Sequence, residues 1–372
     1  MRAATVSESA QTAARSQLGE WGLFLGALLL VLSPVLCCGA ALEALAWRIG
    51  ETMPLTWTSA WQDVAPNRIW RGGDGHSFLA YKLARIADLK PEIVAVGPSR
   101  ANFFRSDATA PYSFFNAGMS AWTFDQYRRF LELLTQNGPP PRALIFNLDY
   151  WMFAEGFDHY FVNRFDEQAS THIADLLRVV AQLRDDPMRL IRGMPATGHV
   201  HGLYAVLTGE GFRPDGSMLL HAEPTSDPQR LFADGTAVGT PPVELRDHMA
   251  DEQIKKFDAF VALAKDKHVA LIGIQLPYYA KILDGLNASP AAGMWREFES
   301  PEWRARVAAA GVVFFDLADM PEYRDKPQYF VDSLDPDTHL VEHVMQLVAA
   351  DPRVRALLPK ITAPLVPSAE AK

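Results

Sequence analysis

The sequence predicts an α/β protein: a five-stranded, mostly parallel sheet flanked by helices and preceded by one transmembrane helix. Short apolar runs alternate with helical patterns from residue 91 onward, which is typical of parallel sheets covered by helices. A single uncharged apolar run stands near the amino terminus, between Glu20 and Glu43. The composition, 49% hydrophobic and 21% charged, is that of a globular protein with a sizeable core.

The uncharged run, Trp21 to Leu42, would span roughly 33 Å as a helix, enough to cross a bilayer core. We interpret it as an uncleaved signal anchor, because a cleaved signal peptide has a shorter apolar region followed by a small-x-small site. The pair Cys37 and Cys38 suggests a lipoprotein signal only faintly, since the residue before the candidate cysteine is not small.

Positive charge near the apolar run predicts its orientation. The amino-terminal flank carries Arg2 and Arg15, and the other flank offers Arg48. The positive-inside tendency therefore makes residues 1–20 a cytoplasmic tail and residues 21–47 the anchor. The sequence predicts a single-pass inner (plasma) membrane protein whose remaining chain is periplasmic or otherwise extracytoplasmic.

Strands and helices are expected in alternation along the rest of the chain. Residues 48–90 form a connector, rich in Trp, Pro and Gly, and a lead-in helix. The five expected strands are 93–97, 112–116, 143–149, 269–274 and 312–315. Helices are expected at 78–86, 123–134, 245–267, 300–311 and 338–350, with a Thr-x-x-Gln capping box and a Ser-Pro start marking the second and fourth.

The strands and helices define one domain, residues 91–355, with an insertion at about 155–245 and a disordered tail at 356–372. Because the insertion leaves from the carboxyl end of the third strand, we expect it to hang over the active-site edge as a lid or substrate platform. An apolar stripe within it is expected to pack on the core; it comprises Ile173, Leu176, Leu177, Val180 and Leu183.

A serine follows the first strand at the position where open α/β sheets bind their ligands. The strand ends in Gly97, and Ser99 comes two residues later. A serine hydroxyl needs a histidine base and an orienting acid to act as a nucleophile. A serine in this position can also simply cap a helix, so the pattern alone does not decide its role.

Partners for Ser99 are expected where other strands end at the same edge. The backbone N–H of Gly118 and the side chain of Asn147, together with the Ser99 N–H, would form an oxyanion hole. His339 is the candidate base. If Asp335 caps the last helix, His339 lies four residues on and shares its face, which makes Asp335 the candidate orienting acid.

Four blocks of sequence follow one another in a recognisable order: Gly97-Pro98-Ser99-Arg100, Asn116-Ala117-Gly118, Ile145-Phe146-Asn147-Leu148-Asp149 and the loop from Asp335 to His339. This order resembles that of the SGNH (GDSL-like) hydrolase superfamily. It is most similar to the membrane-anchored branch that includes the alginate O-acetylation proteins and the D-alanyl transfer protein of teichoic acids. The resemblance covers roughly residues 90–150 and 265–350 and implies a flavodoxin-like sheet, an extracytoplasmic catalytic domain and action beside a multipass membrane-bound O-acyltransferase.

Two positions depart from the superfamily pattern. The acid usually stands three residues before the histidine, where this chain has Pro336, so either Asp335 or Asp337 must serve. The usual Gly-x-Asn-Asp block reads Asn147-Leu148-Asp149-Tyr150 in this chain, so Asp149 is an alternative to Asn147 for the position of the donor asparagine. An ionised carboxylate would repel an oxyanion, which favours Asn147.

Two functions from different classes follow. The first is a serine acyltransferase that moves an acetyl or similar acyl group to an exported or cell-surface polysaccharide, or an SGNH-type esterase that passes it to water. The second is a non-catalytic accessory protein that binds glycan in a polysaccharide secretion complex, since fold does not fix function.

Several other functions are disfavoured by the composition. The net charge of −9 argues against a nucleic-acid surface. Both cysteines lie in the apolar run, which leaves no disulfide framework or thiolate metal site. The chain has no phosphate-cradling glycine loop, and its ten histidines lack zinc-type spacing, so neither a cofactor nor a metal is expected.

Overall fold

Five parallel strands form the central sheet of the computed structural model, which describes residues 4–73, 78–136, 138–160, 165, 170–220, 227–232, 236–240 and 242–362. Their order across the sheet is β3 (Phe114–Gly118), β2 (Ile93–Gly97), β4 (Ala143–Asn147), β8 (Ala270–Gln275) and β9 (Val312–Asp316). Every neighbouring pair is parallel, which confirms the predicted fold class. All five carboxyl ends therefore meet at one edge of the sheet.

The central strands are buried along their whole length, which explains their continuous apolar sequences. Alternate residues of β2 enter different cores: Val94 and Val96 face one side of the sheet, and Ile93 and Ala95 face the other. The second strand begins at Phe114, two residues later than predicted.

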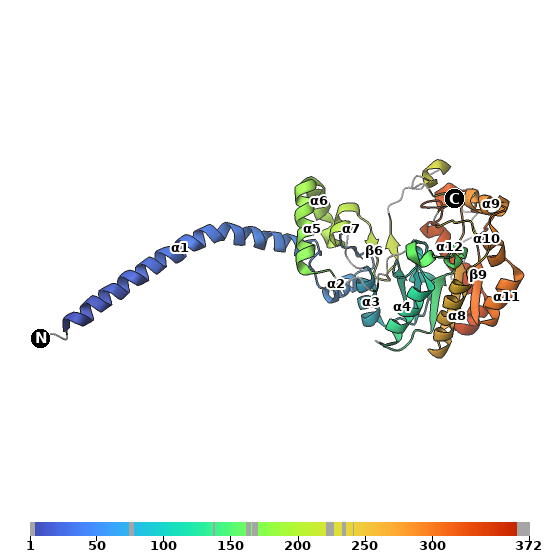
Figure 1. Ribbon diagram of the computed structural model, residues 1–372, viewed down its shortest axis with the longest axis horizontal. Helices are drawn as coiled ribbons and strands as arrows, with labels where there is room; N and C mark the ends of the chain where they lie inside the picture. The colour runs from blue at the N-terminus through green and yellow to red at the C-terminus, as the bar shows by residue number, and fades with distance from the viewer. Residues whose placement is uncertain are drawn as a thin grey trace.

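Helices cover both faces of this sheet (Figure 1). The Val94 side packs against α3 (Phe78–Leu89), α4 (Phe124–Gln136), α8 (Asp251–Asp266), α9 (Ala280–Ala288), α10 (Gly293–Phe298) and α11 (Pro301–Ala309). The Ile93 side packs against α12 (Thr338–Ala350) and α13 (Pro352–Leu357). The predicted helix at 245–267 begins only at Asp251.

The predicted helix starts at α4 and α11 are present. Thr123 Oγ1 accepts from the Gln126 N–H at 3.3 Å, and the Gln126 side chain accepts from the Trp122 N–H at 2.8 Å. Ser300 Oγ accepts from the Trp303 N–H at 3.1 Å, directly before a proline at the first position of α11. These side chains satisfy backbone donors that a helix start leaves unpaired.

The connector and the insertion together build a second, smaller unit, which the sequence did not predict. Its sheet has the strand order β5 (Val200–His201), β1 (Ile69–Trp70), β6 (Gly211–Phe212) and β7 (Met218–Leu219). Its helices are α2 (Leu55–Asp63), α5 (His172–Asp185), α6 (Pro187–Gly193) and α7 (Leu203–Thr208). We call residues 49–73 and 170–220 the small subdomain; the expectation of an irregular connector was wrong for α2 and β1.

The amino-terminal helix α1 (Ala4–Arg48) ends inside the small subdomain. Ala46 and the following Ile49 are fully buried, in one apolar cluster with Val179 of α5 and Leu190 of α6. The rest of α1 projects away from the globular part (Figure 1). Its stretch Leu23–Arg48 is long enough to span a membrane and contains 18 consecutive residues with a mean hydropathy of 2.4.

Two further expectations about packing were wrong. Of the apolar stripe in the insertion, Leu176 and Leu183 do pack against the small subdomain core, but Ile173, Leu177 and Val180 are exposed. The tail was expected to be disordered from residue 356. Instead, α13 continues to Leu357, and both Leu358 and Ile361 are buried against the central sheet; residues 363–372 lie outside the described part.

The small subdomain is attached to β3, the edge strand of the central sheet. The Asn116 N–H donates to the Asp215 carbonyl at 2.7 Å. The buried Lys82 ammonium donates to the Asn116 carbonyl at 2.9 Å and to the Gly216 carbonyl, and it lies 3.9 Å from the centre of the Phe212 ring. These contacts hold the insertion beside β3, so most of it does not hang over the carboxyl edge of the sheet.

Candidate active site

Ser99 lies where the sequence predicted, just beyond the carboxyl end of β2. It opens a short 3₁₀ helix, η1 (Ser99–Phe103), whose cap position is Pro98, so Ser99 is not the capping residue there. The turn is tight at Gly97: a Cβ there would come within 2.6 Å of Asn147 Oδ1 and 2.8 Å of Ala101 Cβ. Only glycine therefore leaves room for the Asn147 side chain and for Ala101 beside the turn that precedes Ser99.

The hydroxyl of Ser99 is hydrogen-bonded to the carboxyl group of Asp335. Asp335 is nearly buried, and its backbone N–H donates to Asp332 Oδ1 at 2.7 Å. Burial and, to a smaller extent, the negative charge of Asp332 raise the pKa of Asp335 to about 7, although Arg100 and the Ser99 hydrogen bond oppose the shift. Asp335 therefore contacts the candidate nucleophile itself.

His339 pairs with the other carboxylate of its loop. Its Nδ1 lies 3.0 Å from Asp337 Oδ2, while Asp337 Oδ1 accepts from the Leu340 N–H at 2.9 Å and caps α12. The helix therefore covers Thr338–Ala350, as expected, and the condition on which Asp335 was chosen, that it caps this helix, is not met. The i, i+4 geometry that favoured Asp335 as the acid for His339 is absent. Asp337 both caps the helix and pairs with His339.

The pair Ser99–Asp335 and the pair His339–Asp337 involve two elements, η1 and α12, that touch. Helix α12 packs against η1, and Leu340 and Phe103 share one buried cluster. The His339 side chain itself is 78% exposed, so it projects from the start of α12 toward solvent. With Nδ1 engaged by Asp337, Nε2 is the ring nitrogen left to exchange a proton with a substrate or with Ser99.

Asp149 belongs to a buried ion pair and not to an oxyanion site. Its Oδ2 lies 3.3 Å from Arg100 Nε, and its Oδ1 accepts from the Tyr278 hydroxyl at 3.1 Å. Burial raises the pKa of Asp149 to about 6, and the Arg100 charge opposes that rise. Asn147 and Asp149 were the two candidates for the oxyanion donor after β4, and Asn147 has no such charged partner among the described residues.

Arg100 is the residue that sequence analysis missed. Its guanidinium is buried and donates to the carbonyl of Leu334, to that of Leu276 at 2.6 Å and to that of Pro277 at 3.3 Å. It thereby joins the loop after β8 to the loop that carries Asp335, while its ion pair reaches the loop after β4. The only sequence signal was its place directly after Ser99, because one buried arginine leaves no periodic pattern.

The two expected oxyanion donors differ. Asn147 is fully buried, and within the described part of the chain neither its side-chain nitrogen nor its oxygen has a hydrogen-bond partner. The Gly118 N–H, in contrast, donates to Asn116 Oδ1 at 2.6 Å, so the expectation that it faces a reacting oxygen was wrong. Sequence analysis also overlooked Asn102, whose buried Oδ1 lies 2.7 Å from where a Cβ on Gly118 would stand.

Two short parts of the insertion reach this edge: the strand β7, which packs against η1, and a segment near residue 230. The 3₁₀ helix η7 (Pro228–Phe232) places the Leu231 carbonyl 2.8 Å from the Ser333 N–H, and the ring of Phe232 lies 6.2 Å from that of Tyr279. The segment therefore braces the loop that holds Asp335. Among the described residues, the insertion touches the candidate site through this segment and through β7, and neither contact forms the lid predicted from the sequence.

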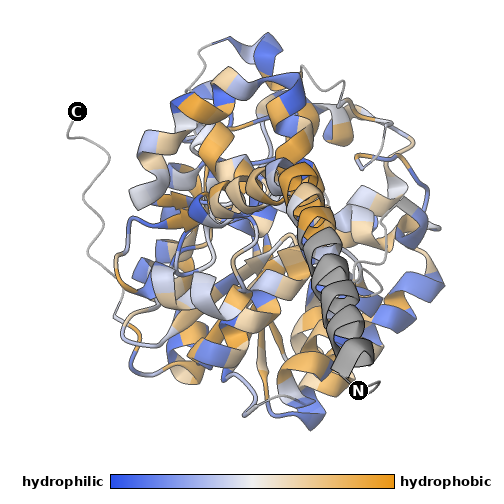
Figure 2. Cartoon of the chain, turned by 90° about the vertical axis from the view of Figure 1, so that its left-hand side faces the viewer, coloured by the Kyte–Doolittle hydropathy of each residue, from blue (hydrophilic) through white to orange (hydrophobic). Residues whose placement is uncertain are grey.

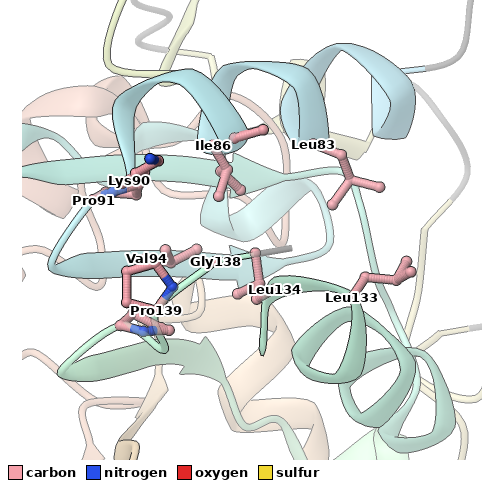
Figure 3. Close-up of a pocket in the computed structure, with 11 residues that line it drawn as sticks. Leu83, Ile86, Lys90, Pro91, Val94, Leu133, Leu134, Gly138 and Pro139 are labelled. Atoms are coloured by element: carbon pink, nitrogen blue, oxygen red, sulfur yellow. The ribbon is translucent and has the colours of Figure 1, made fainter. Parts of the chain in front are cut away.

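A pocket elsewhere in the molecule is unrelated to Ser99. It lies between α3 and α4 beside the first half of β2, where Leu83, Ile86, Val94 and Leu134 line it (Figure 3). Ser99 follows the other end of β2. No group of three or more His, Cys, Asp or Glu side chains is placed to hold a metal ion in the described ranges.

Comparison with models of protein families, with curated proteins and with solved structures finds no match for this chain. The function therefore has to be argued from the residues at the carboxyl edge of the sheet.

Proposed function

We propose that this protein is a membrane-anchored serine acyltransferase of SGNH type, with an acyl-enzyme formed on Ser99. One observation carries the proposal: a serine at the carboxyl end of β2 is hydrogen-bonded to a buried acid in the loop that also carries a histidine–carboxylate pair. Serine, histidine and acid on one loop cluster are what acyl transfer through a serine requires.

In the proposed reaction Ser99 Oγ attacks the acyl carbonyl, His339 Nε2 accepts the hydroxyl proton, and the proton passes to the leaving group of the acyl donor as its bond to the carbonyl breaks. The acceptor hydroxyl then gives its proton to His339 Nε2 and attacks the acyl-enzyme, and Ser99 Oγ leaves with that proton. Asp337 holds the Nδ1–H of His339, so that Nε2 is the basic nitrogen and the imidazolium is stabilised. The His339 imidazole swings toward Ser99 when substrate enters, because in the resting structure the Ser99 hydroxyl is bonded to Asp335. Asp335 then serves to position the hydroxyl before attack.

Asn147 is the proposed side-chain donor to the oxyanion. Its amide is buried, unpartnered among the described residues and in contact with the turn at Gly97. An amide already desolvated in this way loses nothing further when it donates to a developing negative charge. The backbone N–H of Ser99 is the proposed second donor.

The physiological acceptor is proposed to be a sugar hydroxyl of an exported or cell-surface polysaccharide. The resemblance of the four sequence blocks to the membrane-anchored SGNH branch supports this choice. The apolar stretch of α1 supports anchoring, with the sheet on the extracytoplasmic side and a multipass O-acyltransferase as the supplier of the acyl group. Hydrolysis of the same acyl-enzyme by water is the esterase alternative.

A serine-directed fluorophosphonate tests the proposal on the full chain in lipid nanodiscs. We expect covalent labelling that is lost in Ser99→Ala and kept in Ser113→Ala, which removes an exposed serine hydroxyl. Adding oligosaccharide to a chromogenic ester assay then separates transfer from hydrolysis, because only a transferase diverts the acyl group to the sugar.

Absence of labelling in the native chain would favour the accessory-protein alternative. The specific observation on that side is that His339 is exposed and Ser99 is bonded to Asp335 rather than to the imidazole. In that case glycan binding without turnover is the expected activity.

A further inference from the structure

The small subdomain carries an apolar surface that its own core leaves uncovered. Outside α1, the described residues include ten exposed large apolar side chains, and seven of them belong to the small subdomain. Exposed apolar side chains are therefore concentrated on this subdomain and are not scattered over the molecule. Five of them lie on two consecutive helices: Ile173 (70% exposed), Leu177 (61%), Val180 (42%), Met188 (52%) and Ile191 (53%). We call these five the α5–α6 face.

The α5–α6 face stands at the point where α1 enters the globular part. Helix α5 packs against the last turns of α1, and His172 Nε2 lies 2.8 Å from Glu43 Oε2. In Figure 1, α5 and α6 form the side of the molecule from which α1 leaves, with α5 running across the direction of α1. Figure 2 looks onto that side, with α1 pointing at the viewer.

No flexible linker separates α1 from this face. Leu42 and Leu45 pack against the cluster that contains Ala46 and Val179, so the end of α1 and the inner side of α5 share one core. If the apolar part of α1 spans a bilayer, the α5–α6 face is held at the level of the lipid headgroups by packing alone. Connectivity thus selects lipid over a distant protein partner.

The surrounding residues have the chemistry of a membrane interface. Trp47 and Trp57 are both exposed, with ring centroids 5.6 Å apart, beside the end of α1. Tryptophan is enriched at membrane–water interfaces. Arg189 and Arg192 are exposed on α6 next to Met188 and Ile191, where a guanidinium can reach lipid phosphate while its stem covers apolar surface.

We propose that the α5–α6 face lies in the headgroup region of the membrane that α1 spans, so that lipid is the partner of this surface. The proposal rests on the anchoring by α1 given under the proposed function. Helix α5 then behaves as an interfacial amphipathic helix, with Val179 toward the protein and Leu177 toward lipid. Two contacts, α1 and α5–α6, fix the tilt of the sheet and the height of Ser99 above the bilayer.

Fluorescence quenching by spin-labelled lipid tests this on the full chain in nanodiscs. In a Cys37→Ser, Cys38→Ser background, a fluorophore is placed on Leu177→Cys, Ile191→Cys or, as a control on the exposed side of α11, Glu302→Cys. A fourth site, Leu30→Cys, reports on α1. We expect headgroup-proximal doxyl lipids to remove most of the emission at 177 and 191 and none at 302, and deep doxyl lipids to quench 30.

The outcomes separate the two proposals. Quenching at 30 without quenching at 177 and 191 would overturn the lipid contact and leave the span intact. Absence of quenching at 30 would overturn the span and the lipid contact together. A Leu177→Glu, Val180→Glu variant, with both changes on exposed positions, is expected to fold and to show weaker quenching at 191, because the packing on α1 is kept while the apolar contact with lipid is lost.

Discussion

Asp337 makes two contacts, one with His339 Nδ1 and one with the Leu340 N–H, and replacing it by Asn or by Ala separates their effects. An asparagine can still accept from the Leu340 N–H through Oδ1, so the start of α12 is kept, but it no longer offers a carboxylate to His339 Nδ1. We expect turnover to fall by orders of magnitude, up to about 10⁴-fold as in the best-studied serine triad. Because the His339 side chain is 78% exposed, the pair itself adds little to stability, and the melting temperature should hardly move.

Asp337→Ala removes the cap as well, so it should show the same loss of turnover and in addition about 1 kcal/mol of lost stability. The assay is kcat/KM with a chromogenic acyl ester, beside thermal unfolding of the same nanodisc samples. Asp335→Asn is the matched comparison: it can still hydrogen-bond Ser99 and is expected to reduce turnover much less. The reasoning is refuted if Asp335→Asn abolishes turnover while Asp337→Asn stays within a few-fold of the native chain.

Three further predictions concern stability and topology. Burial holds the pKa of Asp335 at about 7 against an ordinary 3.8. Its contribution to stability is therefore complete below about pH 4 and is lost as the pH rises through 7. In Asp335→Asn the melting temperature should depend less on pH over this range than it does in the native chain. Arg100→Met strands a buried carboxylate and is expected to cost about 3–5 kcal/mol in denaturant titrations, whereas the paired Arg100→Met, Asp149→Leu change should recover part of that, and no recovery would speak against the pair. Protease added outside intact cells should degrade the chain beyond residue 50, and protection of that region with an accessible amino terminus would reverse the proposed orientation.

The central sheet was predictable because its signals are local. Each of its strands is a short apolar run, four of them wholly or largely buried and β9 partly buried, and two of the helices carry caps at Thr123 and Ser300 that the structure confirms. The second sheet was not predictable for the opposite reason. Its strands are two residues long, too short for any periodicity, and β1 meets its partners only because the chain returns more than a hundred residues later.

The orienting acid was mispredicted for a physical reason that the structure identifies. The helix itself was expected at 338–350, but the choice of Asp335 required it to begin at Pro336, a favourable first position for proline. Instead, Pro336 pairs with Phe330 as an isolated antiparallel bridge, and the Val331 N–H donates to the Asp335 carbonyl at 2.8 Å. These bonds close the loop 330–336 on itself, move the helix start to Thr338 and turn Asp335 inward to Ser99.

Arg100 holds the candidate site together, because its guanidinium binds the loop that carries Asp335 as well as two other loops. A buried guanidinium needs acceptors and a counter-charge, and Arg100 finds them on the loops after β4, β8 and β9, which it thereby joins. Leu334, whose carbonyl Arg100 binds, directly precedes Asp335, and Ser99 directly precedes Arg100, so the same contacts hold Asp335 beside Ser99. Blocks that look separate along the chain are therefore parts of one desolvated cluster, and substitution of Arg100 should disturb Ser99 and Asp335 together.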